Sequence, residues 1–231
     1  MSAQQSDNNG QARAPGTTSE ELTPALGSTL LRVAWLAILL GLAMEFLLVL
    51  ASSFGGALGD LGPLVADLVK NVSWSVFVCV GLAVGTAAVE ARVAVMGFLG
   101  LISAPLAFEI SRALHKGALQ ALKINATGGE DLSPLVVVAI KGLEYGCLGL
   151  AVGWVSQRRW GGALAHLGVG LLIGLGFGGS DIAYATGGTF QESTADFLSD
   201  AVYEVLFPVG CAMVLFAATT LGKRAASHGG T

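Results

Sequence analysis

Runs of apolar residues close to twenty in length are the feature that most constrains the fold of this chain. They include Leu30–Leu50, Val72–Val89 and Gly161–Phe177. A helix of about 20 residues spans a bilayer core of about 30 Å. Only 12% of the 231 residues are charged, whereas soluble domains have about 25%. The sequence therefore predicts an all-α membrane protein.

Six segments of this kind predict a bundle of six transmembrane helices. Their expected bounds are about Thr29–Phe54, Pro63–Ala88, Arg92–Leu114, Leu132–Val155, Trp160–Ala185 and Thr194–Leu221. Together they form one polytopic transmembrane domain over residues 28–222. The polar residues 1–27 predict a disordered tail, and residues 223–231 predict a short C-terminal tail. The long connection over residues 116–131 predicts a separate surface helix at Ala118–Ile124.

One helix pattern occurs twice and predicts internal duplication of a two-helix unit. The five residues Gly81–Gly85 return unchanged as Gly149–Gly153, and each copy begins two residues after a cysteine. Upstream, a Pro-Leu-Val segment is followed in both copies by a lysine and an aromatic residue, seven and eleven positions after the proline. These residues are Pro63, Lys70 and Trp74 in the first copy and Pro134, Lys141 and Tyr145 in the second.

The sixth segment resembles a third copy of the same unit. Asp200 and Phe207 have the spacing of Asp67 and Trp74. The first and third segments also begin alike, with Arg-Val-Ala. Three parallel two-helix units would be related by a pseudo-threefold axis along the membrane normal, although the twofold duplication is the more direct interpretation.

The distribution of basic residues predicts the orientation, because cytoplasmic connections are enriched in Lys and Arg. The residues on the richer side are Arg32, Arg92, Arg158, Arg159, Lys223 and Arg224. The opposite side has Arg112, Lys116 and Lys123, all close to one connection. We therefore expect a multi-pass protein of a cell membrane with both termini in the cytoplasm, and the composition favours a bacterial source.

Glycine at four-residue spacing is expected to hold the helices together. This spacing places glycine on one helix face and lets a second helix approach closely. The candidate packing residues are Gly81, Gly85, Gly149, Gly153, Gly170, Gly174 and Gly178. Packing within the bundle is the favoured interpretation, and self-association into an oligomer is the alternative.

Ionisable residues inside the predicted spans are the candidates for function. Lys141 and Glu144 lie on one helix face at i, i+3, whereas Glu45 and Glu204 have no partner of opposite charge on their own helix. A central Lys or Asp costs about 2.5–3.5 kcal/mol on insertion, and each Leu, Ile or Val returns about 0.3–0.6 kcal/mol. The fourth segment therefore needs support from its neighbours or from water. These four residues are candidates for an ion or proton pathway, although Lys141 and Glu144 fit a structural ion pair equally well.

This pattern predicts an integral membrane transporter or channel-like protein with an acidic outward-facing vestibule for a cation or proton. The alternative is a non-catalytic structural or assembly subunit of a membrane complex, packed through Gly-rich helix faces. An enzyme is the least favoured interpretation, because no nucleotide-binding, zinc-protease or serine-hydrolase motif occurs. No cofactor or metal is expected. The expected partners are the lipid bilayer and either further copies of the chain or subunits of a membrane complex, but not a nucleic acid.

Overall fold

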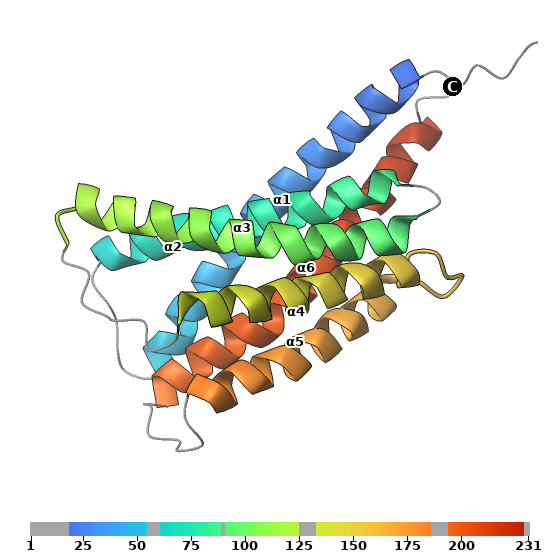
Figure 1. The fold of residues 1–231 in the computed structure, drawn as a ribbon. Helices are drawn as coiled ribbons and strands as arrows, with labels where there is room; N and C mark the ends of the chain where they lie inside the picture. The colour runs from blue at the N-terminus through green and yellow to red at the C-terminus, as the bar shows by residue number, and fades with distance from the viewer. Residues whose placement is uncertain (1–18, 55–60, 89–90, 125–132, 186–193, 229–231) are drawn as a thin grey trace, which may run out of the picture.

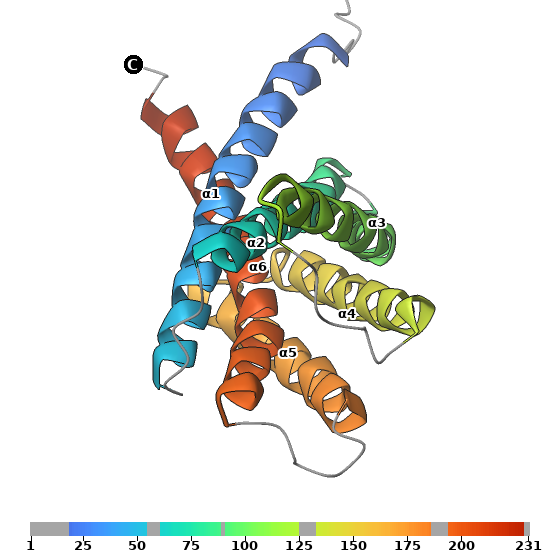
Figure 2. The same cartoon turned by 90° about the vertical axis from the view of Figure 1, so that its left-hand side faces the viewer.

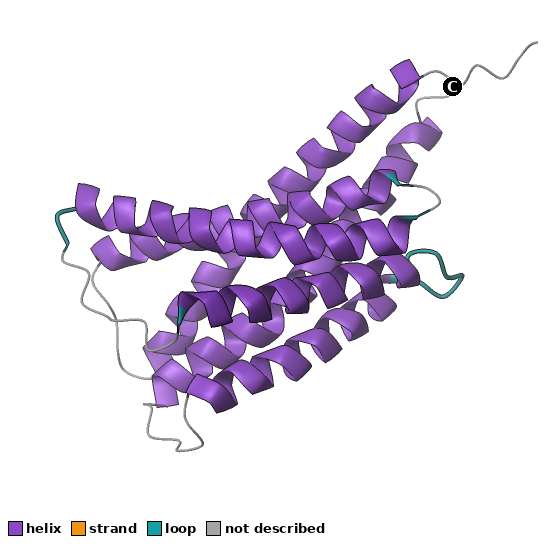
Figure 3. Cartoon of the chain, in the orientation of Figure 1, coloured by secondary structure: helices purple, strands orange, loops and turns teal. Residues whose placement is uncertain are grey.

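The computed structural model describes residues 19–54, 61–88, 91–124, 133–185 and 194–228. Within these ranges every helix or strand assigned is a helix, and Figure 3 draws these helices in purple and the described loops in teal. The helices are α1 (Ser19–Phe54), α2 (Leu61–Val84), α3 (Arg92–Ala121), α4 (Pro134–Val155), α5 (Ala163–Ala185) and α6 (Thr194–His228), with a short 3₁₀ turn, η1 (Gly85–Ala87), after α2. The expected all-α class is confirmed.

Five described helical segments are long and apolar enough to cross a membrane. They are Leu26–Ser53, Gly62–Ala87, Arg92–Ala121, Leu135–Val155 and Ala201–Gly222. A sixth apolar segment, Ala163–Gly179, is shorter within the described residues. Their large side chains are extensively exposed on the outer faces, with Trp35, Phe98 and Leu172 among them. Five such helices are compatible with a multi-pass membrane protein.

Three helices extend beyond the segments predicted from hydropathy. Helix α1 begins at Ser19 rather than near Thr29, and α6 continues to His228 rather than ending near Leu221. Acidic residues favour a helix N-terminus and basic residues a C-terminus, which fits Glu20 and Glu21 in the first turn of α1 and Lys223 and Arg224 near the end of α6. The separate surface helix expected at Ala118–Ile124 is wrong, because α3 runs without a break to Ala121.

The helices are arranged as consecutive antiparallel neighbours (Figures 1 and 2). Helix α3 packs along α2 on one side and along α4 on the other, α5 packs along α6, and α1 packs against both α2 and α6. Helix α4 meets α5 and α6 over a smaller area. The first turns of α1 and the last turns of α6 lie at the same end of the bundle as the connection between α4 and α5.

Glycines allow several of these helices to approach closely. A Cβ atom built on Gly85 would come within 2.8 Å of Met96 Cα, and one on Gly153 within 3.1 Å of Val93 Cα. The other five candidate glycines also lie against a neighbouring helix. Their neighbours are Ser103 for Gly81, Met96 for Gly149, Val209 for Gly170, Val205 for Gly174 and Glu204 for Gly178. A larger residue at these positions would separate the backbones.

Candidate functional site

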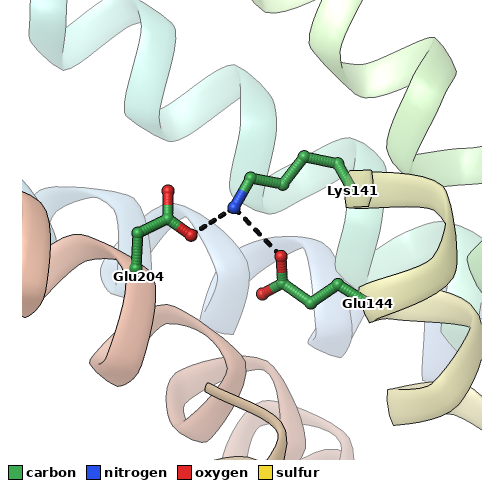
Figure 4. Close-up of polar contacts among 3 residues, drawn as sticks. All are labelled: Lys141, Glu144 and Glu204. Atoms are coloured by element: carbon green, nitrogen blue, oxygen red, sulfur yellow. Dashed lines mark hydrogen bonds and ion pairs between the residues drawn. The ribbon is translucent and has the colours of Figure 1, made fainter. Parts of the chain in front are cut away.

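Three of the four candidate pathway residues meet at one buried place between α4 and α6 (Figure 4). The Lys141 ammonium donates a hydrogen bond to Glu144 at 3.0 Å from Nζ to Oε2. It also donates to Oε2 of Glu204, which lies 63 positions away in the sequence. We refer to Lys141, Glu144 and Glu204 as the ion triad. It bridges two helices that otherwise touch little.

Burial differs among the three side chains of the ion triad. The Glu144 side chain is 0% exposed, Lys141 is 8% exposed and Glu204 is 16% exposed. Removing charges from water is costly unless they are paired and hydrogen-bonded, and the ammonium pairs with one oxygen of each carboxylate. Glu204 is the most exposed member of the ion triad.

The fourth candidate, Glu45, lies in a separate polar contact between α1 and α2. Its carboxylate Oε2 accepts a hydrogen bond from Asn71 Nδ2 at 2.7 Å, and both residues are buried. One turn further along α2, Ser75 Oγ donates to the Ala37 carbonyl of α1 at 2.7 Å. No described hydrogen bond or ion pair joins Glu45 to the ion triad within the ranges that the structure covers.

Three aromatic rings lie beside the ion triad and contact one another, one each from α2, α4 and α6. The centroid of Trp74 is 5.7 Å from that of Tyr145 and 6.2 Å from that of Phe207, and the latter two centroids are 6.5 Å apart. All three pairs meet edge to face, a favourable arrangement for aromatic rings. We refer to these three buried residues as the aromatic trio. Tyr145 directly follows Glu144 in α4, and Phe207 follows Glu204 by one helical turn in α6.

Histidines form two further contacts between helices. Near the end of the molecule that carries the α4–α5 connection, buried His166 lies 3.2 Å from Ser156 Oγ and 3.0 Å from the Gly162 carbonyl oxygen. On α3, His115 Nε2 lies 3.1 Å from Asp67 Oδ1 of α2, and both side chains are partly exposed. Asp67 and Lys70 also lie at i, i+3 on α2, and this local spacing gives no indication of the contact with α3.

The described cysteines are free thiols. Cys79 and Cys211 are buried with their sulfur atoms 3.4 Å apart, and Cys147 is half-buried on α4. Among the described residues, no group of three or more His, Cys, Asp or Glu side chains has the arrangement needed to hold a metal ion.

No protein-family model, curated protein or solved structure matches this chain.

The sequence did not single out Asn71, although it supplies the hydrogen bond that Glu45 needs. The available signal was the position of Asn71 inside an apolar segment. A polar group buried at that depth needs a hydrogen-bond partner. Gly97 and Gly100 were also missed, because their three-residue spacing differs from the four-residue pattern. A Cβ on Gly100 would come within 2.7 Å of the Tyr145 carbonyl carbon, so this glycine also marks a close approach between α3 and α4.

Proposed function

We propose that this chain is an integral membrane transporter or channel-like protein that conducts a cation or proton. An acidic vestibule, open to the outside, leads to the ion triad. The chain crosses a cell membrane six times and keeps both termini in the cytoplasm. The observation that carries the proposal is the pairing of Lys141 with two carboxylates from different helices, buried among apolar segments.

The energetic cost of the ion triad supports a functional role. Charged residues inside transmembrane segments are expensive and usually line substrate or ion pathways. If stability alone were required, apolar residues could replace all three, because a buried ion pair seldom stabilises more than well-packed apolar side chains of similar volume. Because Glu204 is the more exposed carboxylate, it is the point at which the vestibule reaches the triad.

The aromatic trio supplies a barrier next to this site. In the proposed orientation α4 and α6 run inward, so Tyr145 and Phe207 lie on the cytoplasmic side of Glu144 and Glu204. Tightly packed apolar side chains block ions, because an ion cannot enter without its hydration shell or a substitute for it. We therefore propose that the aromatic trio blocks ion passage below the triad in this conformation.

Internal duplication gives this arrangement a simple origin. Trp74, Tyr145 and Phe207 occupy corresponding positions in the three proposed two-helix units, and their rings contact one another. Transporters built from parallel repeats have an axis along the membrane normal and hold their substrates near the repeat interface. We place the aromatic trio on such a pseudo-threefold axis.

Ion flux into liposomes tests the proposal. The purified chain is reconstituted, and uptake of H⁺, Na⁺ and K⁺ is followed with ion-sensitive dyes. Neutralising Glu45 and Glu204 together should abolish the flux, and Glu204→Gln alone should remove most of it. The matched control is Glu109→Gln, which neutralises an exposed carboxylate on α3 and should retain the flux. Unchanged flux in the double variant, or no flux from the unaltered chain, would overturn the proposal.

One observation favours the alternative of an assembly subunit. On α5, a Cβ atom added at Gly168 or Gly179 would meet no atom within 4 Å, and large apolar residues such as Leu172 are exposed on the same helix. Such a face could receive a helix from another subunit. Native mass spectrometry after extraction in mild detergent distinguishes the two: stable copurification with a larger complex supports the subunit role, and an isolated particle that conducts ions excludes it.

A further inference from the structure

The connection between α4 and α5, residues 156–162, is a tight hydrogen-bonded turn at one end of the bundle (Figure 3). The Arg158 N–H donates to the Val155 carbonyl oxygen at 2.9 Å, and the Gly161 N–H donates to the Arg158 carbonyl oxygen at 3.0 Å. Buried His166 contacts both ends of the connection from within α5. The backbone therefore presents the side chains of this turn in a defined arrangement.

Two tryptophans and an arginine are stacked at this turn. The rings of Trp154 and Trp160 meet edge to face with their centroids 5.5 Å apart, and both side chains are exposed. Arg158 Cζ lies 4.5 Å from the centroid of the Trp154 ring. A stacked guanidinium group contacts the ring through its flat face, whereas its five N–H donors lie in its plane. The stacking therefore leaves these donors directed away from the ring.

The charge of this turn is positive. Arg159 follows Arg158, and both side chains are exposed. No aspartate or glutamate occurs in the sequence between Glu144 and Asp181, so neither the turn nor the adjoining halves of α4 and α5 supply a carboxylate. Guanidinium groups bind phosphate and carboxylate through two parallel N–H···O bonds. The turn is therefore suited to an anion of this geometry.

Exposed apolar side chains next to the arginines indicate where that anion comes from. Trp160 is 59% exposed, and Leu164 in the first turn of α5 is 84% exposed. Leu172 and Leu175 continue the exposed apolar surface along α5. Tryptophan is enriched at the headgroup level of a bilayer, where the anionic groups are those of lipids. A free phosphate ion would make no use of this apolar surface, whereas an acyl chain would cover it.

We propose that the α4–α5 connection is a binding site for one anionic phospholipid. The guanidinium groups of Arg158 and Arg159 hold its phosphate, and Trp160 and Leu164 contact the first part of an acyl chain. Two positive charges exceed the single charge of a phosphodiester. Arg158 also covers one face of the Trp154 ring, where a quaternary ammonium could otherwise bind. The site should therefore prefer phosphatidylglycerol to phosphatidylcholine. This inference goes beyond the proposed function and does not depend on transport.

Native mass spectrometry of the purified full chain tests the inference. Phosphatidylglycerol and phosphatidylcholine with the same acyl chains are added in equal amounts in mild detergent, and the retained lipids are identified. The unaltered chain should retain mainly phosphatidylglycerol. Each basic residue near an anionic lipid surface strengthens binding about fivefold, so Arg158→Gln with Arg159→Gln should weaken it about twentyfold. Equal retention of the two lipids by the unaltered chain, or unchanged binding in the double variant, would overturn the inference.

The matched control neutralises two other basic residues. Lys116 and Lys123 are exposed and precede α4 in the sequence, and replacing both with glutamine should leave phosphatidylglycerol binding unchanged. An equal loss in this control would show that binding follows the total charge of the protein, and it would overturn the assignment to the α4–α5 connection.

A competition experiment on the unaltered chain distinguishes a lipid from a free phosphate. Inorganic phosphate or glycerol phosphate is added to the complex with phosphatidylglycerol at constant ionic strength, with chloride as the reference anion. Neither should displace the lipid, because neither contacts the apolar surface of Trp160 and Leu164. Displacement at concentrations comparable to that of the lipid would show that the turn recognises phosphate alone, and it would overturn the inference.

Discussion

At the scale of single residues, the buried carboxylates of this protein are satisfied in two different ways. Glu45 accepts a neutral hydrogen bond from the Asn71 amide, whereas Glu204 pairs with the Lys141 ammonium. A neutral donor leaves the negative charge uncompensated, and an ammonium cancels it. The two sites therefore respond differently when one partner is changed.

Asn71→Leu alone should destabilise the protein more than replacing both Glu45 and Asn71 with leucine. The single change leaves the Glu45 carboxylate buried without its donor, at a cost of about 1–3 kcal/mol. Replacing Glu45 and Asn71 together with leucine removes both polar groups, and this replacement is close to neutral when the shapes fit. Thermal unfolding in detergent, arranged as a double-mutant cycle, measures the coupling. Additive losses would show that the hydrogen bond contributes nothing.

The sequence revealed only part of the ion triad. Three-residue spacing on one helix was sufficient to place Lys141 beside Glu144, because the helical period fixes which side chains are neighbours. Glu204 could be named as an intramembrane carboxylate without a partner on its own helix. Its contact with Lys141 depends on how α6 packs against α4, and no local spacing encodes that. Asn71 escaped notice for the same reason, since its partner is on another helix.

At the scale of helices, glycine sets how closely neighbours pack. Along α5, Gly170, Gly174 and Gly178 all lie against α6, the last of them against Glu204. Sequence spacing was sufficient to mark these glycines, but not to identify the helix that each one meets. Helix ends were less predictable. Hydropathy marks only where the apolar segment ends, whereas the helix itself can continue beyond that segment, as α1 and α3 do.

Gly178→Ala and Gly179→Ala should have opposite effects although they are adjacent. A Cβ at Gly178 would come within 2.7 Å of Glu204 Cβ, whereas one at Gly179 would meet nothing within 4 Å. The first substitution should overpack the α5–α6 contact and cost about 1–3 kcal/mol. The second should be neutral or stabilise by up to about 1 kcal/mol, because alanine favours a helix. Melting temperatures of the two variants in one detergent give the comparison, and equal values would contradict it.

At the scale of the whole molecule, the order of the helices was readable from apolar runs, and the length of α5 decides whether it can cross the membrane. The apolar part of α5, Ala163–Gly179, has 17 residues and is about 26 Å long at about 1.5 Å per residue, less than a bilayer core of about 30 Å. The complete helix Ala163–Ala185 has 23 residues and is about 35 Å long by the same rise. Its length therefore suffices for a sixth crossing when its polar end reaches the interface.

Cysteine labelling in cells tests both the orientation and the sixth crossing. Lys116 precedes α4 in the sequence and Arg158 follows it, and both side chains are exposed. An impermeant maleimide added outside should label Lys116→Cys and spare Arg158→Cys, because the basic side should be cytoplasmic. Ser227→Cys, near the end of α6, decides the crossing of α5. If α5 and α6 both span the bilayer, this residue returns to the side of Arg158 and is labelled only in inside-out vesicles. Labelling of Ser227→Cys from outside would leave α5 as a helix that does not cross, and the vestibule would then have to form from five spans.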